Sequence, residues 1–283
     1  MDFDGTLTAE EQQARALADR SLDTLANEIV RAPRAELEQT YDATQARLLE
    51  APHRYWWEVN GLIASFCDEG AFILNTTTLQ TMLRENDAYL QAVTEAFQET
   101  EYEAVVDCTN YLFHRHTAEL APVFRPAAQR VLSALAEQPD RDPVILTNSL
   151  GDKVRCHLGT LGVENWVTVL GDTRQYEMDP TWTRHFHHPE LGEIQVWPVS
   201  KKRSVDLRRP AYFQALAEAL DQDPQIAVVA DTFSLPGALA LMMDLHFLLL
   251  RTSYTPDWCA QIVEAHPQGQ VLDDLGDLPI VLN

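Results

Sequence analysis

The second half of the chain alternates short apolar runs with helical segments, and this alternation limits the folds open to it. The runs are PVILTNS, WVTVLGD, QIAVVADT and HFLLLRT, and a segment with helical spacing lies between each pair. Strands of four to six apolar residues alternating with helices are typical of βαβ units and a parallel sheet. The sequence therefore predicts an α/β protein with a doubly wound parallel-sheet (Rossmann-like) core.

The first half follows a different pattern. Thr8 is a plausible N-cap, Glu10 and Glu11 fall in the first turn that follows, and apolar residues recur at helical spacing to about Leu120. We expect the aromatic group RYWWEVNGLIASFC to pack in the core of this helical bundle. The predicted organisation is an α/β catalytic core over 1–8 and 122–283, with a helical cap inserted at 9–121.

The chain is acidic, with 43 Asp and Glu residues against 21 Lys and Arg residues and a formal net charge of −22. Such a surface repels nucleic-acid backbones and anionic membranes, so neither is expected as a partner. An anionic substrate would need a metal ion or a local positive group in order to bind. The sequence leaves the oligomeric state open.

Cysteine usage and the N-terminal residues bear on the compartment. The four cysteines form no Cys-x-x-Cys pair and no zinc spacing, which favours free buried thiols in a reducing cytosol. The N-terminal residues are acidic where a secretion signal would be basic and then apolar, and no run approaches the roughly 18 residues of a membrane span. We expect a cytoplasmic protein.

The opening residues MDFDGTLTAEEQQ allow two interpretations by themselves. In a calcium loop, Gly5 would be the sharp-turn glycine, Asp2 and Asp4 would be ligands, and Glu11 would bind bidentately. In a phosphoryl-transfer site, Asp2 would be the nucleophile and Asp4 its acid/base partner. The calcium interpretation lacks its first ligand position, a preceding helix and a second loop of the same kind, so the second interpretation is preferred.

Two predicted strand ends support phosphoryl transfer. The run PVILTNS places Thr147, Asn148 and Ser149 at the carboxyl end of its strand, and QIAVVADT places Asp231 at the end of another. Ligands of parallel sheets bind at this edge. Two carboxylates and a carbonyl can hold Mg²⁺, which screens the repulsion between an anionic nucleophile and a phosphate, while neutral donors bind the phosphate oxygens.

The segments DFDGTLT, VILTNS and VVADT, in this order, resemble the motifs of the haloacid dehalogenase-like (HAD) hydrolase superfamily, whose members are mostly Mg²⁺-dependent phosphatases. The resemblance spans nearly the whole chain and includes a helical cap inserted after the first motif. It implies an enzyme that hydrolyses a small phosphorylated metabolite through an aspartyl-phosphate. The dehalogenase branch lacks an aspartate at the position of Asp4, so Asp4 favours a phosphate ester over a haloacid.

The resemblance also implies roles for individual residues. Asp2 would be the nucleophile, and Asp4 would be the general acid/base whose backbone carbonyl reaches the metal. Gly5 would let the backbone come close to the phosphate, and Thr6 would fix the turn. The remaining assignments are Thr147 and Asn148 as ligands of the phosphoryl oxygens and Asp231, with Asp2 and Asp4, as ligands of Mg²⁺.

Three departures from the family pattern stand out. The first motif normally follows a central strand, for which the residues before Asp2 leave no room, so we expect an upstream extension in the native gene or a misassigned start. A second acidic residue usually follows the one aligned with Asp231 by four or five positions, where this chain has Leu235 and Pro236. Its absence would weaken metal binding or leave a water in its place.

The third departure concerns the lysine that stabilises the aspartyl-phosphate. Lys202 is the preferred candidate, and the rivals are Lys201, Arg208 and Arg209, while Lys153 lies earlier in the sequence on a predicted helix. An arginine would supply the charge with a different geometry.

Two alternative functions and one additional site stay open. The chain could be a catalytically weakened binding or regulatory protein that keeps the fold, or a phosphotransferase or mutase with the same aspartate nucleophile. Metal binding by His185, His187 and His188 lacks a supporting carboxylate pattern, and a solvated loop is the preferred interpretation. The surrounding segment with Trp182 and Trp197 is interpreted as an inserted loop near the substrate entrance.

Overall fold

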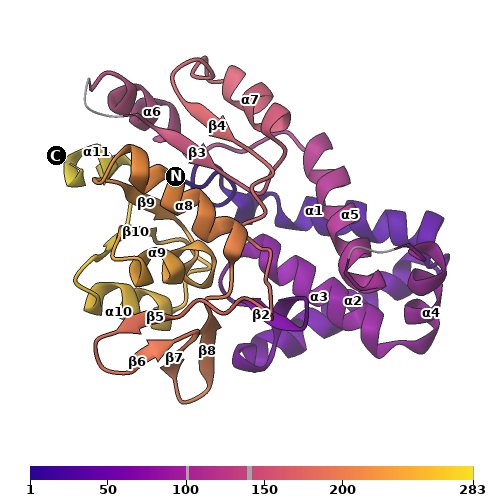
Figure 1. Ribbon diagram of the computed structural model, residues 1–283. Helices are drawn as coiled ribbons and strands as arrows, with labels where there is room; N and C mark the ends of the chain where they lie inside the picture. The colour runs from indigo at the N-terminus through magenta and orange to yellow at the C-terminus, as the bar shows by residue number, and fades with distance from the viewer. Residues whose placement is uncertain (100–101, 139–141, 283) are drawn as a thin grey trace.

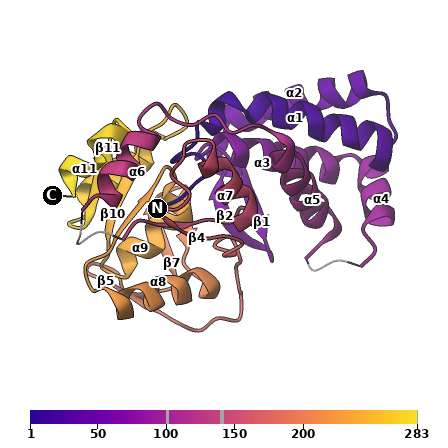
Figure 2. The same cartoon turned by 90° about the horizontal axis from the view of Figure 1, so that it is seen from above.

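The computed structural model describes residues 1–99, 102–138 and 142–282 and has a mixed α/β architecture. Helices α1–α5 gather on one side of the molecule, and the remaining helices with the parallel strands form the other side (Figure 1). Figure 2 shows the same separation from above. We call these parts the helical region and the α/β region. Residues 100–101, 139–141 and 283, which fall within the expected cap and core ranges, lie outside the described residues.

The helical region is built on one apolar cluster that α1–α5 share, including the buried side chains of Leu22, Leu37 and Leu83. Asn86 caps α4 because its side-chain oxygen accepts from the backbone N–H groups of Ala88 and Tyr89. The helices of this region are α1 (Ala14–Thr24), α2 (Arg34–Glu50), α3 (Ala71–Glu85), α4 (Asp87–Ala96) and α5 (Ala104–Glu119), with short turns η1 (Glu10–Gln12), η2 (Leu25–Ile29) and η3 (Pro52–Arg54).

The helical region also contains a β-hairpin that the sequence interpretation missed. Strands β1 (Trp56–Val59) and β2 (Leu62–Phe66) pair antiparallel, so the aromatic group does not belong to a helical bundle alone. The turn residues Asn60 and Gly61 both have positive φ, 52° and 74°. An Asn-Gly pair between two apolar runs is the usual signal for this hairpin, and it was present in the sequence.

The α/β region contains two parallel sheets. One has the order β11-β10-β9, and the other pairs β3 with β4. The strands are β3 (Val144–Leu146), β4 (Thr168–Leu170), β9 (Ala227–Ala230), β10 (His246–Leu250) and β11 (Gly269–Leu272). The helices are α6 (Ala128–Ala136), α7 (Gly151–Gly159), α8 (Pro210–Gln222), α9 (Ala238–Met242), α10 (Asp257–Ala265) and α11 (Leu278–Val281), with turns η4 (Phe233–Gly237) and η5 (Leu275–Asp277).

The first two residues connect the two sheets. The backbone N–H of Leu146 donates to the Met1 carbonyl at 2.9 Å, and the N–H of Asp2 donates to the Val229 carbonyl at 2.9 Å. The N-terminal ammonium group of Met1 donates to the Val144 carbonyl at 2.8 Å. Met1 and Asp2 thus lie between β3 and β9, and the opening loop begins at the carboxyl ends of both strands.

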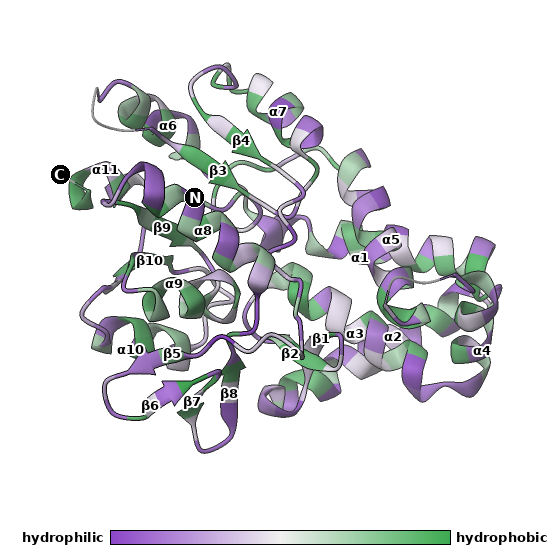
Figure 3. Cartoon of the chain, viewed as in Figure 1, coloured by the Kyte–Doolittle hydropathy of each residue, from purple (hydrophilic) through white to green (hydrophobic). Residues whose placement is uncertain are grey.

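The interior of the α/β region lies on both sides of these strands. One cluster joins Phe3, Leu7, Ile145 and Val229 to helices α6 and α7, and another packs α8, α9 and α10 against β9 and β10. Strand β3 and helix α9 are largely hydrophobic in Figure 3. Strand β4, by contrast, is not buried, although the apolar run WVTVLGD favours burial: Thr168 and Leu170 at the sheet edge are exposed.

The segment expected to be an inserted loop forms two antiparallel hairpins. They consist of β5 (Phe186–His188) with β6 (Gly192–Ile194) and β7 (Val196–Ser200) with β8 (Arg203–Asp206). Trp197 is buried there and packs edge-on against Phe233, with 5.5 Å between ring centroids. No helix in the described ranges combines the length and apolar character needed to cross a membrane.

Candidate active site

The opening loop is held at the carboxyl ends of β3 and β9 by contacts within itself and with the segment before α6. The N–H groups of Leu7 and Thr8 both donate to the Phe3 carbonyl, at 3.0 and 3.2 Å. The Arg125 guanidinium donates to the Gly5 carbonyl from Nε at 3.0 Å and Nη2 at 2.5 Å. These bonds fix a tight turn, and they leave the Asp2 and Asp4 side chains directed to the same cavity.

Gly5 is required by the close approach of Asp231. Its φ of +78° lies in the left-handed region, and a Cβ atom added there would lie 2.1 Å from Asp231 Oδ2. Beside it, the Thr6 hydroxyl donates to Asp231 Oδ1 at 3.3 Å. Only glycine admits both the backbone conformation and the neighbouring carboxylate.

The end of β3 supplies neutral hydrogen-bonding groups. Thr147 Oγ1 accepts from the Ser149 backbone N–H at 3.1 Å, so its hydroxyl hydrogen is left for another acceptor. Asn148 Oδ1 accepts from the Gln175 N–H at 2.6 Å, which leaves the Asn148 amide group as a donor. Both side chains therefore suit an anionic ligand.

These strand ends meet in one cavity of about 110 Å³. Five of the expected site residues line it: Asp2, Asp4, Thr147, Asn148 and Asp231. Gly5 and Thr6 lie behind Asp231, in contact with its carboxylate. The opposite wall comes from the helical region, from β1, α3 and α5.

The carboxyl groups of Asp2, Asp4 and Asp231 line one cavity, in which Asp231 is buried and Asp2 and Asp4 are half-buried. Burial raises the pKa of Asp2 well above its usual value, and the charges of Asp231 and Asp4 raise it further. Burial likewise raises the pKa of Asp231, with an added contribution from Glu10. Like charges in a site of low dielectric favour protonation, and a bound cation would reverse this effect.

This donor set suits Mg²⁺. Within the described ranges no three His, Cys, Asp or Glu side chains are already placed around one point as metal ligands. Mg²⁺ nevertheless needs only one or two carboxylates, because it keeps several of its waters. Asp2 and Asp231 line the same cavity, so the two carboxylates that such a site needs are present there.

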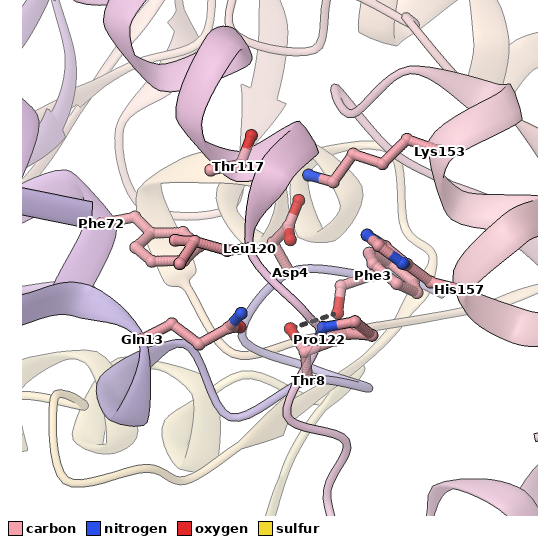
Figure 4. A pocket seen from close by; sticks show the side chains of 10 residues that line it. All are labelled: Phe3, Asp4, Thr8, Gln13, Phe72, Thr117, Leu120, Pro122, Lys153 and His157. Atoms are coloured by element: carbon pink, nitrogen blue, oxygen red, sulfur yellow. Dashed lines mark hydrogen bonds between the residues drawn. The ribbon is translucent and has the colours of Figure 1, made fainter. Parts of the chain in front are cut away.

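Asp4 takes part in a second group of contacts, which the sequence interpretation had not connected to the site. The Ser149 hydroxyl donates to Asp4 Oδ2 at 2.6 Å, and Lys153 Nζ donates to Ser149 Oγ at 3.1 Å. In Figure 4 the Asp4 carboxylate lies at the centre of a small cavity, and the Lys153 side chain extends toward it from α7. His157, one turn further along α7, stacks on Phe3.

The structure does not bring Lys202 to this site. Lys202 is exposed in the turn between β7 and β8, where its backbone N–H donates to Ser200 Oγ, and Lys201 beside it is exposed as well. A two-residue hairpin turn directs such side chains to solvent, so Lys202 is replaced by Lys153 as the lysine near the carboxylates. Lys153 lies only four residues after Ser149 at the end of β3, and this short separation in the sequence was the signal that could have identified Lys153.

The two arginine rivals have structural partners. Arg208 pairs with Asp206 through Nη2 at 2.5 Å. Arg209 is fully buried and donates to the carbonyls of Ala64, in β2, and Gln175. Burial lowers the pKa of Arg209 to about 10. Arg209 thus connects the helical and α/β regions beside the cavity without lining it.

Glu10 is a further cavity residue that the sequence interpretation placed only in a helical turn. Its carboxylate is buried and accepts from the backbone N–H groups of Ala71 at 2.5 Å and Phe72 at 3.3 Å, at the start of α3. Burial raises its pKa to about 8. The contact depends on residues 61 positions apart, so no local pattern indicates it.

The position expected to carry a second acid is apolar. Leu235 and Pro236 are buried in η4 after Asp231, and Leu235 lines the cavity. Glu69 approaches this turn from the helical region, and its carboxylate accepts from the Ser234 N–H at 2.7 Å. The turn that follows Asp231 is therefore fixed by a carboxylate from a different segment.

The three histidines of the β5 hairpin lie away from the cavity. His185 and His187 are exposed, and the His187 ring lies 3.2 Å from Glu193 Oε1, whereas His188 packs edge-on against Trp197. They do not form a metal cluster within the described residues.

No family model matches the sequence, and no curated protein sequence matches it. Solved structures match its fold. A predicted phosphoglycolate phosphatase from Haemophilus somnus 129PT aligns with a TM-score of 0.51 at 15% identity, over 100% of this chain and 96% of that one. The putative HAD-hydrolase YfnB from Bacillus subtilis, crystallised bound to magnesium, aligns with a TM-score of 0.50 at 16% identity, again over 100% and 96%.

Proposed function

Because the chain has the fold of the haloacid dehalogenase-like hydrolases, we propose that it is a phosphatase that hydrolyses a small phosphate monoester with Mg²⁺. The observation that carries this proposal is the convergence of Asp2, Asp4, Thr147, Asn148 and Asp231 on one cavity. In this proposal the α/β region is a doubly wound catalytic core, and the helical region is a cap that covers the cavity.

Asp2 is the proposed nucleophile. Its Oδ1 accepts from the Phe3 N–H at 2.8 Å, which fixes the carboxylate and leaves Oδ2 to attack phosphorus. A new Oδ2–P bond forms while the bond from phosphorus to the ester oxygen breaks, giving an aspartyl-phosphate. Water then attacks this phosphorus, the Oδ2–P bond breaks, and inorganic phosphate and the free carboxylate result.

Asp4 is the proposed acid and base. It gives its proton to the departing ester oxygen and later accepts one from the attacking water. The Ser149 hydroxyl holds Asp4 Oδ2, so Oδ1 is left for these transfers. The two steps together return the Asp4 carboxyl group to its starting protonation state.

Charge on the phosphoryl group is balanced by several groups. Thr147 and Asn148 donate to its oxygens, and Lys153 contributes a positive charge beside them. Mg²⁺, held by Asp2, Asp231 and the Asp4 carbonyl, would supply electrostatic screening between the carboxylates and the phosphate.

The test is phosphate release from 4-nitrophenyl phosphate by the purified protein, with MgCl₂ or with EDTA. We expect Mg²⁺-dependent release that Asp2→Asn abolishes. Release that persists in EDTA, or in Asp2→Asn, contradicts the proposed mechanism. Adding an acceptor alcohol and measuring transferred against free phosphate distinguishes a hydrolase from a phosphotransferase or mutase.

The alternative of a catalytically weakened binding protein has one observation in its favour, the apolar Leu235 and Pro236 where a second acid is expected. It is distinguished by Mg²⁺-dependent binding of a phosphonate without release of phosphate from any ester.

A further inference from the structure

The helical wall of the cavity differs in composition from the strand-end wall. Its side chains include the aromatic rings of Trp57, Phe72 and Phe113, together with the neutral polar groups of Thr76 and Asn110. These residues lie on β1, α3 and α5. A leaving group bound beyond the phosphate would contact these groups.

Two aromatic pairs line the cavity. Trp57 lies 5.6 Å from Tyr176 between ring centroids, so this pair joins the helical region to the α/β region. Phe72 and Phe113 are also 5.6 Å apart, in an edge-to-face arrangement within the helical region. Leu235, where an acidic residue was expected, adds an apolar surface beside the first pair. Such surfaces favour a flat, apolar group.

The cavity lining contains no lysine or arginine among the described residues. The nearby cations have other partners: Lys153 contacts Ser149, Arg125 contacts Gly5 and Glu11, and Arg209 donates to two carbonyl oxygens.

Among the described residues that line the cavity, His114 is the basic side chain on the helical wall. Its pKa is lowered by burial and by the charge of Lys153, and is raised in part by Asp172 and Asp4. Burial thus disfavours the charged imidazolium, so His114 is a poor counter-charge for a second anionic group on the substrate.

We propose that the substrate is a phosphate monoester whose leaving group is uncharged and carries an aromatic ring or a comparable apolar group. The inference rests on the proposed function and narrows it. Such a substrate differs from phosphoglycolate, whose leaving group carries a carboxylate. Burying an unpaired carboxylate near Asp2, Asp4 and Asp231 would be unfavourable.

Three esters with the same reacting centre test the charge requirement. They are benzyl phosphate, 4-carbamoylbenzyl phosphate and 4-carboxybenzyl phosphate, and the last two have nearly the same shape. We expect kcat/KM for the carboxylate to fall at least about tenfold below that for the amide. We expect 2-phosphoglycolate to be hydrolysed more slowly than benzyl phosphate.

An added cation should change this preference. Thr76→Lys places an ammonium group on the cavity wall. It should raise the ratio of kcat/KM for the carboxylate ester to kcat/KM for the amide ester at least about fivefold. Ala88→Lys, on an exposed site of α4, makes the same change in net charge and should leave the ratio unchanged.

Binding of benzylphosphonate and 4-carboxybenzylphosphonate, measured by calorimetry with Mg²⁺, separates recognition from catalysis. Tighter binding of benzylphosphonate than of 4-carboxybenzylphosphonate supports the inference, whether or not any ester is hydrolysed. The absence of ester hydrolysis together with such binding would contradict the proposed function alone. Equal or better hydrolysis of the 4-carboxybenzyl ester or of 2-phosphoglycolate overturns the inference and leaves the phosphatase proposal standing. Failure to bind either phosphonate and to hydrolyse any ester contradicts both.

Discussion

The two walls of the cavity differ in kind. The strand-end wall carries the carboxyl groups of Asp2, Asp4 and Asp231. Gly5 leaves room there for the Asp231 carboxylate, whose Oδ2 would lie 2.1 Å from an added Cβ atom. The helical wall carries rings and neutral polar groups. The difference implies a division of roles, in which one wall performs the reaction and the other selects the leaving group. Substitutions on the first wall should then lower kcat, and those on the second should raise KM.

Asp2→Asn should have the largest effect. The change keeps the shape of the side chain and the bond from Phe3 but removes the nucleophilic oxygen, so kcat should fall at least about 10³-fold. Steady-state phosphate release from benzyl phosphate measures this. Phosphonate binding serves as the control and should persist, because removing one like charge relieves repulsion in the cavity. Weaker phosphonate binding with kcat unchanged would show that Asp2 binds the ligand and is not the nucleophile.

Gly5→Ala should follow in magnitude. The added methyl group meets the Asp231 carboxylate, and φ of +78° is strained for alanine, so kcat should fall about 10²-fold and stability by about 2 kcal/mol. Activity at saturating Mg²⁺ and urea unfolding check both. Gly61→Ala is a matched control, since its φ is +74° and nothing lies within 4 Å of the added Cβ. Equal loss of activity in both variants would show that strain alone is responsible.

Lys153→Met compared with Lys202→Met tests which lysine belongs to the strand-end wall. Loss of the ammonium group next to Ser149 should lower kcat about 10- to 100-fold, whereas Lys202→Met in the exposed β7–β8 turn should change it less than about twofold. Steady-state kinetics at several Mg²⁺ concentrations measures the effect. The reverse result would assign the phosphate-stabilising role to Lys202.

Trp57→Ala examines the helical wall. Removing the ring that faces Tyr176 should raise KM for benzyl phosphate about tenfold and change kcat less than about threefold. The same variant should hardly affect a small ester such as methyl phosphate. A large fall in kcat for both esters would contradict the division between the walls.

The strand-end wall was largely predictable from the sequence, and the physical reason is local. Thr147, Asn148 and Asp231 directly follow apolar runs, and parallel strands bring their carboxyl ends to one edge. The hairpin at Asn60 and Gly61 also has a local signal, but the helical spacing of the residues on both sides obscures it.

The rest of the site depends on tertiary contacts that no short pattern specifies. Lys153 lies four residues after Ser149, but the hydrogen bond from Ser149 to Asp4 spans 145 positions. Glu10 contacts the start of α3 across 61 positions, and Glu69 contacts Ser234 across 165. Charged residues at such positions look solvated in the sequence, because nothing nearby indicates the burial that changes their chemistry.

Glu10 gives the smallest predicted effect and connects the two walls. Its carboxyl group belongs to the cavity and accepts from the first amides of α3, and burial raises its pKa from 4.5 to about 8. A carboxyl group with a raised pKa binds more protons in the folded state, so its contribution to stability is full below about pH 4.5 and is lost as pH rises toward 8. Glu10→Gln keeps an acceptor oxygen and removes this titration.

In EDTA, the unfolding temperature of the wild-type protein should therefore fall more between pH 5 and pH 8 than that of Glu10→Gln. The remaining slope of the variant reports Asp2 and Asp231, whose pKa values burial also raises. Mg²⁺ should flatten both curves, because a cation favours the ionised carboxylates. Parallel curves for wild type and Glu10→Gln would mean that the Glu10 carboxyl group keeps one charge state throughout. The contact of Glu10 with the start of α3 would then contribute the same stability at every pH in this range.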